Sequence, residues 1–196
     1  MRIIIVGGGI GGLMCALHLA RRKHHEVLVL EQGDYWGGRL FTMPDGYEAG
    51  GARFHAGHRK LMRLLRAFRL QSIRIPGLAR IDKAALQRLC RATPSRKTTL
   101  QHADLATLKQ QLGYQGEFDL THGQEAQRLI CHDLARRSYY VVQGGFSALV
   151  QKMHARIQRY GGTTRLQAAV VRVEGEPGAF RVQLTHETLS ADRVIL

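Results

Sequence analysis

The alternation of apolar and polar positions predicts a strand, a helix and a second strand within the first thirty residues. Residues 3–6 are a β-branched run ended by glycines, which is typical of a strand buried on both faces of a parallel sheet. The next segment has one apolar helical face, formed by Leu13, Ala16, Leu17 and Ala20. Residues 27–30 form a second apolar run. The pattern indicates a βαβ unit and therefore an α/β fold.

Helical spacing recurs in four later segments, and strand-like runs occur in three. The helices are predicted over residues 58–70, 84–89, 121–137 and 147–160. The strands are predicted over residues 170–173, 180–184 and 194–196, with a turn signal at 174–178. We therefore expect region 71–143 to be a mostly helical insertion between two parts of one α/β domain, residues 1–70 and 144–196.

Three glycines in the pattern G-x-G-x-x-G occupy the turn between the first strand and the first helix. Gly7 permits the tight turn, Gly9 lets a pyrophosphate approach the backbone, and Gly12 lets helix and strand pack closely. Glu31 stands nineteen residues after Gly12, where a carboxylate can accept hydrogen bonds from ribose hydroxyls and would repel a 2′-phosphate. The combination predicts a dinucleotide site. The alternative is a glycine-rich turn that binds no ligand.

A second glycine-rich element, Gly37-Gly38-Arg39, follows Glu31 closely. Two glycines let the backbone come near a phosphate, and an arginine can clamp it with two parallel hydrogen bonds. An ordinary NAD domain has no need of this second element.

Several segments together resemble the flavin-containing amine oxidase superfamily, which includes phytoene desaturases and protoporphyrinogen oxidases. The resemblance is carried by residues 3–13, 29–31, 37–39, 47–54, 144–150 and 191–196. It covers roughly residues 1–70 and 138–196. It implies a Rossmann-like FAD-binding domain, a parallel sheet with a crossover β-meander, and it assigns part of the substrate domain to the insertion at 71–143.

The resemblance also implies which residues contact FAD. The first glycine turn would hold the pyrophosphate, Glu31 the adenosine ribose, and Arg39 a phosphate. Residues 51–54 would lie along the isoalloxazine, mostly through their backbone, and Val170 would contact the adenine through its backbone. The predicted cofactor-binding residues are Gly7, Gly9, Ile10, Gly11, Gly12, Glu31, Gln32, Gly38, Arg39, Gly51, Ala52, Arg53, Phe54 and Val170.

The chain departs from the family pattern at three positions. Arg53 and Phe54 stand where many amine oxidases carry an aromatic and an aliphatic residue, and Glu48 stands where many carry Asp. This variant resembles amine-oxidase-like proteins of some large DNA viruses. Arg53 is interpreted either as a flavin neighbour or as a surface charge.

The resemblance implies an FAD-dependent oxidoreductase that takes a hydride from an amine or a related small substrate, with the flavin reoxidised by O₂. No catalytic residue is identified. The apolar run at 194–196 ends the sequence inside an expected strand, so the chain is expected to be the front part of a longer flavoprotein. The lysine that commonly holds a water near the flavin N5 would then lie beyond residue 196. Two alternatives remain: a catalytically inactive FAD- or nucleotide-binding module of a larger assembly, and a basic nucleic-acid-binding protein.

The charge is strongly positive, since 29 Lys and Arg against 15 Asp and Glu give +14. The basic residues are spread along the chain without aromatic interleaving or a nucleic-acid motif, so three partners are left open: an acidic protein chain or larger assembly, nucleic acid, and an acidic part of the same protein beyond residue 196. The basic helix at 58–70 is interpreted as a core-facing helix with a solvated basic side, rather than as a membrane or nucleic-acid surface.

The remaining composition is that of an ordinary globular domain. Cys15, Cys90 and Cys131 are too few and too scattered for a disulfide scaffold or a zinc site, and they fit a reducing compartment. No apolar run approaches the ~20 residues that cross a bilayer, and the N-terminus lacks a signal-peptide pattern. A soluble cytoplasmic protein is expected, with virion association following only from the viral resemblance. The ten histidines complete no metal-ligand cluster, so no metal is expected.

Overall fold

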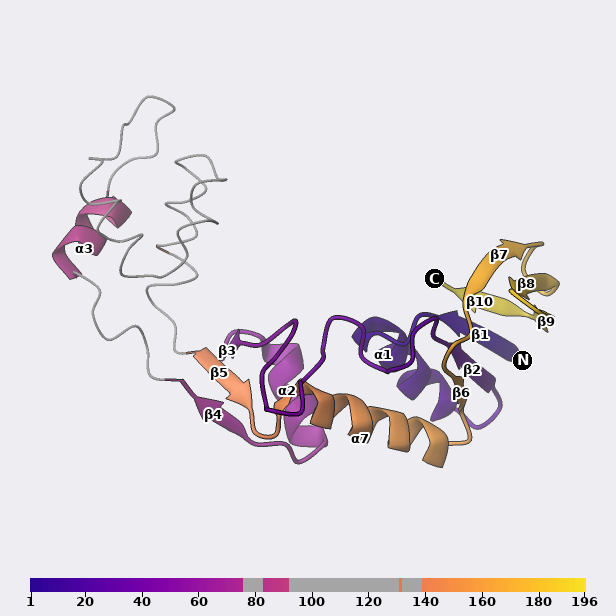
Figure 1. The fold of residues 1–196 in the computed structure, drawn as a ribbon, viewed down its shortest axis with the longest axis horizontal. Helices are drawn as coiled ribbons and strands as arrows, with labels where there is room; N and C mark the ends of the chain where they lie inside the picture. The colour runs from indigo at the N-terminus through magenta and orange to yellow at the C-terminus, as the bar shows by residue number, and fades with distance from the viewer. Residues whose placement is uncertain (76–82, 92–130, 132–138) are drawn as a thin grey trace, which may run out of the picture. The chain divides into compact units, whose positions relative to one another are not determined.

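The computed structural model describes residues 1–75, 83–91, 131 and 139–196, which fall into two compact units (Figure 1). The first unit comprises Met1–Arg53, Lys60–Ile73 and Val141–Leu196. The second comprises Phe54–Arg59 and Arg74–Tyr140.

A four-stranded parallel sheet is the centre of the first unit. Its strands are β1 (Arg2–Val6), β2 (Glu26–Leu30), β6 (Thr163–Arg165) and β10 (Arg193–Ile195), in the order β10-β1-β2-β6. Helix α1 (Ile10–Ala20) connects β1 to β2, which confirms the predicted βαβ unit. The strand β6 was not predicted, because its sequence is polar and it occupies an edge of the sheet.

A three-stranded antiparallel meander follows β6. It consists of β7 (Val170–Glu174), β8 (Phe180–Leu184) and β9 (Thr188–Ala191), in that order. The chain then returns to the parallel sheet as β10, beside β1. This is the crossover β-meander that the resemblance implies, and the fold is the predicted Rossmann-like one.

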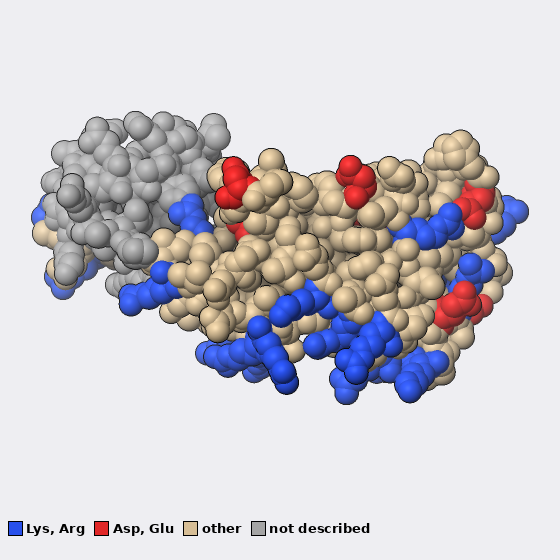
Figure 2. Space-filling model, turned by 60° about the horizontal axis from the view of Figure 1, so that its bottom comes forward, with Lys and Arg blue, Asp and Glu red and all other residues tan. Residues whose placement is uncertain are grey.

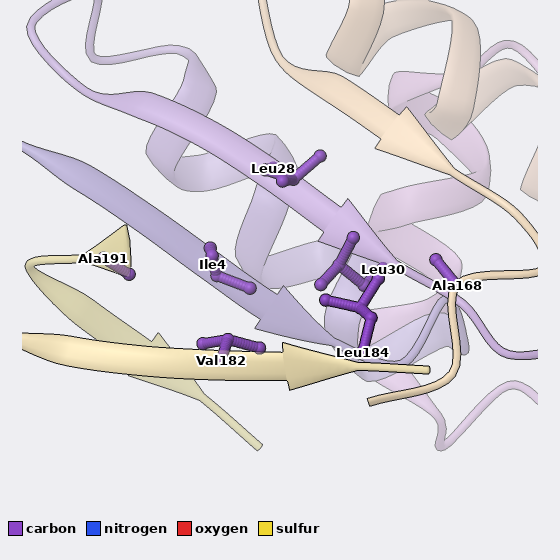
Figure 3. Packing of buried hydrophobic residues seen from close by; sticks show 7 residues of the cluster. All are labelled: Ile4, Leu28, Leu30, Ala168, Val182, Leu184 and Ala191. Atoms are coloured by element: carbon purple, nitrogen blue, oxygen red, sulfur yellow. The ribbon is translucent and has the colours of Figure 1, made fainter. Parts of the chain in front are cut away.

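A buried cluster lies between the parallel sheet and the meander. Alternate strand positions from both sheets point toward each other there (Figure 3). The buried cluster consists of Ile4, Leu28, Leu30, Ala168, Val182, Leu184 and Ala191. Against β1 and β2, helix α1 buries Leu13, Ala16 and Ala20.

Two further helices complete the described part of the first unit. Helix α7 (Gly145–Arg159) packs against α1, and its buried side consists of Phe146, Leu149, Val150, Met153 and Ile157. It ends before Gly161, whose φ of +86° suits the glycine stop predicted from the sequence. Helix α2 (Arg59–Ala67) begins in the second unit and buries Leu65, with Phe68 buried just beyond its end.

The predicted insertion is bounded by strands rather than helices. The strands β3 (Phe54–His55), β4 (Ser72–Arg74) and β5 (Tyr139–Val142) form a sheet in the order β3-β5-β4. Helix α3 (Lys83–Arg91) confirms the helix predicted at 84–89. The helix predicted at 121–137 lies outside the described residues, apart from residue 131.

The structure corrects the expectation for the cysteines. Cys90 and Cys131 form a disulfide across a sequence separation of 41 residues, and Cys15 is free. The sequence did not reveal this pair, since the spacing of two cysteines does not determine whether their backbones meet.

Candidate functional site

The glycines of the first turn meet different surroundings. Gly7 has a φ of +103°, which L side chains rarely adopt. A Cβ on Gly12 would lie 2.0 Å from the Gly7 carbonyl oxygen, so this glycine allows α1 to pack on β1. A Cβ on Gly9 would meet no atom within 4 Å. Gly9 therefore leaves open space at the start of α1, where the predicted pyrophosphate requires it.

The N-terminus of α1 offers backbone donors to that space. The Leu13 amide donates to the Gly9 carbonyl at 2.9 Å, which closes the first turn of α1. The first-turn amides of a helix have no acceptor within the helix, and together with the positive end of the helix dipole they suit an anionic ligand.

The second glycine element lies directly beside the first. The Gly37 amide donates to the Gly8 carbonyl at 2.9 Å, and Gly37 forms a parallel bridge with Gly9. Gly38 has a φ of +58°, and a Cβ there would lie 3.3 Å from the Gly9 Cα. The predicted FAD residues Gly9 and Gly38 are thus brought together from sites 29 residues apart in sequence.

Glu31 follows the C-terminal end of β2 and binds the glycine turn. Its Oε2 accepts the Gly8 amide at 2.7 Å, and its Oε1 accepts the Gly33 amide at 2.8 Å. A carboxylate oxygen has a second lone pair, so Glu31 can still accept ribose hydroxyls. The packing role of Gly8 was not predicted: a Cβ there would lie 2.4 Å from the Trp36 ring.

The segment between β6 and β7 pairs with the backbone around Glu31. The Glu31 amide donates to the Arg165 carbonyl at 2.9 Å, and the Ala168 amide donates to the Glu31 carbonyl at 2.8 Å. Val170 begins β7 two residues later. The chain therefore enters β7, the strand predicted to contact the adenine, from beside the C-terminal end of β2.

The predicted phosphate ligand Arg39 is exposed and lies on a segment packed beside residues 50–51. Its carbonyl oxygen accepts the Gly51 amide at 2.8 Å, and a Cβ on Gly50 would lie 2.0 Å from that oxygen. Gln32 and Gly11, two other predicted contacts, are also exposed.

Thr42 and Glu48 form hydrogen bonds with the N-terminus of α7, and we call this arrangement the Glu48 clasp. Glu48 accepts the Phe146 amide at 2.7 Å and the Thr42 hydroxyl at 2.9 Å. The Thr42 amide donates to Ser147 Oγ at 2.8 Å, and the Ser147 amide donates to Thr42 Oγ1 at 3.0 Å. A Cβ on Gly145 would collide with Thr42. The clasp therefore connects the loop that follows Arg39 to α7, and no pattern in the sequence predicts it.

Arg53 and Phe54 stand at the boundary between the two units. Arg53 is exposed. In the second unit, Phe54 is 1% exposed and its ring stacks on Tyr140 with centroids 5.9 Å apart. The Phe54 side chain therefore packs β3 against β5, and its predicted flavin contact stays a prediction.

Several of the described histidines contact another aromatic or imidazole ring. The rings of His55 and His58 lie 3.8 Å apart, and His55 Nδ1 accepts the Gly57 amide. His154 stacks on Trp36 and shares a 2.8 Å hydrogen bond with Thr164 Oγ1, and its desolvation lowers its pKa. The described residues contain no group of three or more His, Cys, Asp or Glu that could hold a metal. Among them there is also no helix long and apolar enough to cross a membrane.

Two family models match the chain in succession. Residues 5–68 match a NAD(P)-binding Rossmann-like domain, and residues 74–196 match the flavin containing amine oxidoreductases.

Two curated proteins resemble a short part of the chain. A 4,4'-diapolycopen-4-al dehydrogenase of Metabacillus indicus is 56% identical over 48 residues, which are 24% of this chain and 10% of that protein. A 1-hydroxycarotenoid 3,4-desaturase of Flavobacterium sp. (strain P99-3) is 45% identical over 56 residues, or 29% and 10% of the two chains.

Solved structures resemble the whole chain in fold. A putrescine oxidase bound to putrescine has a TM-score of 0.65 at 20% identity and covers 100% of this chain. A protein from Exiguobacterium sp. 255-15 described as a protoporphyrinogen oxidase has a TM-score of 0.60 at 19% identity and covers 98%. This chain covers 58% of each of these two structures.

Proposed function

Since the chain belongs to the family of flavin-containing amine oxidoreductases, we propose that it forms the FAD-binding part of an enzyme that oxidises a small organic substrate. Its cofactor is FAD. The observation that carries the proposal is the packing of Gly37 and Gly38 against Gly8 and Gly9. This packing brings two glycine backbones to the start of α1, where a Cβ added to Gly9 would meet no atom within 4 Å.

The residues present fit the pyrophosphate and ribose of the cofactor. The amides of Ile10 and Gly11 would donate to phosphate oxygens, and the exposed Arg39 would supply a charged donor. Glu31, held by two backbone amides, would accept the ribose hydroxyls. Bound FAD would supply the hydride acceptor, while the protein binds and orients it.

The gap at Gly9 allows a test that separates cofactor binding from folding. Gly9 has an ordinary φ of −69°, so Gly9→Ala introduces neither backbone strain nor a contact within the protein. We expect Gly9→Ala to keep the urea midpoint of the FAD-free protein unchanged and to weaken FAD binding at least tenfold, measured from flavin absorbance and fluorescence. Equal FAD affinity in the two proteins, or no flavin uptake by the wild type, contradicts the proposed site.

For the substrate, we propose an amine or a related compound whose hydride passes to the flavin, with O₂ as the electron acceptor. The fold shared with putrescine oxidase supports the amine. A second candidate is a carotenoid-like polyene, which the two curated relatives favour. Anaerobic mixing with an amine panel and with solubilised polyenes distinguishes them, because the true substrate bleaches the flavin absorbance. Bleaching by neither class would favour a flavin-binding module without turnover.

A further inference from the structure

A basic hollow lies between the C-terminal end of α2 and the outer side of α7, both in the first unit. Its volume is about 580 Å³, and we call it the basic groove. It is lined by Ala67, Phe68, Arg69, Lys152, Ala155, Arg156 and Arg159. Figure 2 shows Lys and Arg side chains gathered along the lower side of this view. None of the lining residues belongs to the predicted FAD site.

Among the residues that the structure describes, no acidic side chain pairs with the cations of the basic groove. Residues 59–75 and 139–173, which contain α2 and α7, include no Asp or Glu at all. The groove has four cations: Arg69, Lys152, Arg156 and Arg159. None of them takes part in an ion pair among the described residues. On α7, Lys152, Arg156 and Arg159 follow at spacings of four and three residues, where like charges repel.

Two of these cations are held in place by the end of α2. Lys152 Nζ donates to the Phe68 carbonyl at 3.0 Å, and Arg156 Nη1 donates to the Ala67 carbonyl at 3.4 Å. The Arg156 guanidinium also lies 4.1 Å from the centre of the Phe68 ring. A lysine has three N–H donors and an arginine five, so most donors remain available while the side chains are already ordered.

The third cation occupies a backbone position that glycine usually fills. Arg69 has a φ of +52°, and its amide donates to the Arg66 carbonyl while the Leu70 amide donates to the Leu65 carbonyl. These two bonds form a Schellman motif, in which the left-handed residue is most often Gly or Asn. An arginine there strains the backbone, so the end of the helix does not explain its presence.

We propose that the basic groove binds linked phosphates, the di- or triphosphate group of a small ligand. Arginine and lysine together provide the charged, forked donors that phosphate oxygens accept. The groove has the volume of a small-molecule site. Because it is hollow, it can surround a short polyanion more closely than it could contact a partner with a flat surface. The site is separate from the FAD diphosphate site and does not depend on the proposed redox function.

Calorimetric titration of the FAD-saturated protein tests the proposal, because FAD then occupies the glycine turn. We expect tripolyphosphate to bind with one-to-one stoichiometry and orthophosphate to bind at least tenfold more weakly. Arg69→Gly and Arg159→Gln should each weaken tripolyphosphate binding at least fivefold. Arg22→Gln, an exposed charge outside the groove lining, should change it less than twofold. If the chain takes up no FAD, the same variants still report on the groove, whereas Gly9→Ala reports on the glycine turn.

Arg69→Gly carries its own control for folding. Glycine relieves the left-handed strain, so the thermal midpoint should rise by about 2–4 °C while phosphate binding weakens. ATP titrated in parallel identifies the source of the phosphates: tighter binding than tripolyphosphate indicates a nucleotide, and weaker binding an inorganic chain. The proposal is overturned if Arg22→Gln weakens binding as much as the groove variants do. It is also overturned if tripolyphosphate does not bind and a duplex oligonucleotide does.

Discussion

Neighbouring glycines of the first turn have different physical roles, which the space around each one distinguishes. At Gly12 an added methyl group would meet the Gly7 carbonyl, and at Gly8 it would meet the Trp36 ring. At Gly9 and Gly11 it would meet no protein atom within 4 Å. Gly8 and Gly12 are therefore required by packing, whereas Gly9 is left for a ligand.

Substituting Gly12 and Gly11 should consequently give opposite effects on stability. We expect Gly12→Ala to lower the free energy of unfolding by about 3 kcal/mol, because the backbone oxygen of Gly7 cannot move aside without displacing α1 from β1. The control Gly11→Ala lies in the first turn of α1 and should raise it by up to about 1 kcal/mol. Urea unfolding of the FAD-free proteins measures both, and equal losses would show that the turn is not packed as described.

At the scale of elements, the Glu48 clasp replaces a conventional helix cap. Gly144 precedes α7 and has no side chain to offer, so the carboxylate of Glu48 accepts the Phe146 amide instead. A negative charge at this end of a helix is favourable, since it opposes the positive end of the helix dipole. The clasp also joins two parts of the chain that are 98 residues apart.

Removing the Glu48 carboxylate should loosen α7 and the loop after Arg39 together. We expect Glu48→Ala to cost about 2–3 kcal/mol, because it breaks one charge-assisted bond to an amide and one to a hydroxyl. Asp45→Asn changes an exposed carboxylate of the same loop and should stay within about 0.5 kcal/mol. Guanidinium unfolding followed by circular dichroism compares the two; a loss no larger than that of Asp45→Asn would contradict the clasp.

His154 on α7 should make the stability depend on pH. Its folded-state pKa lies below the ordinary value of 6.5 because the ring is desolvated. The unfolded chain therefore takes up the proton first, so the free energy of unfolding should be highest above pH 6.5 and fall as the pH drops below it. Urea titrations at pH 7.5 and 5.5 should show a smaller decrease for His154→Gln than for the wild type. An equal decrease would assign the effect to other groups.

The elements that the sequence predicted correctly are those whose own residues carry the burial pattern. The apolar runs of β1 and β2 and the inner side of α7 are recognisable without their partners. The strand β6 is different, because Thr163–Arg165 pairs with β2 at a sheet edge and needs no apolar side chains. The Glu48 clasp could not be predicted either, since nothing local to Glu48 indicates that Phe146 lies beside it. The FAD contacts assigned by resemblance stay predictions.

At the scale of the whole molecule, both apolar burial and a disulfide stabilise the described structure. The described part of the first unit is built on the buried cluster between the parallel sheet and the meander. The second unit contains the Cys90–Cys131 disulfide. Closing a loop of this length restricts the unfolded chain and is worth roughly 4 kcal/mol in the chain-entropy model.

Counting free thiols tests directly whether the Cys90–Cys131 disulfide is present. The denatured, unreduced protein should take up one alkyl group, at Cys15, and the reduced protein should take up three. Cys15→Ser should take up none before reduction and two afterwards. Intact mass spectrometry after alkylation gives the counts, and three groups on the unreduced wild type would show that the disulfide is absent.

The position of β1 in the sheet has a consequence for synthesis on the ribosome. β1 pairs with β2 on one side and with β10 on the other, and the Arg2 amide also donates to the Asp192 side chain. At ribosomal rates of 5–20 residues per second, β1 waits about 10–40 s before β10 is made. During that interval one edge of an apolar strand is unpaired and can add to the edges of other chains. Rapid synthesis of β10 therefore shortens the time during which β1 can pair with the wrong strand.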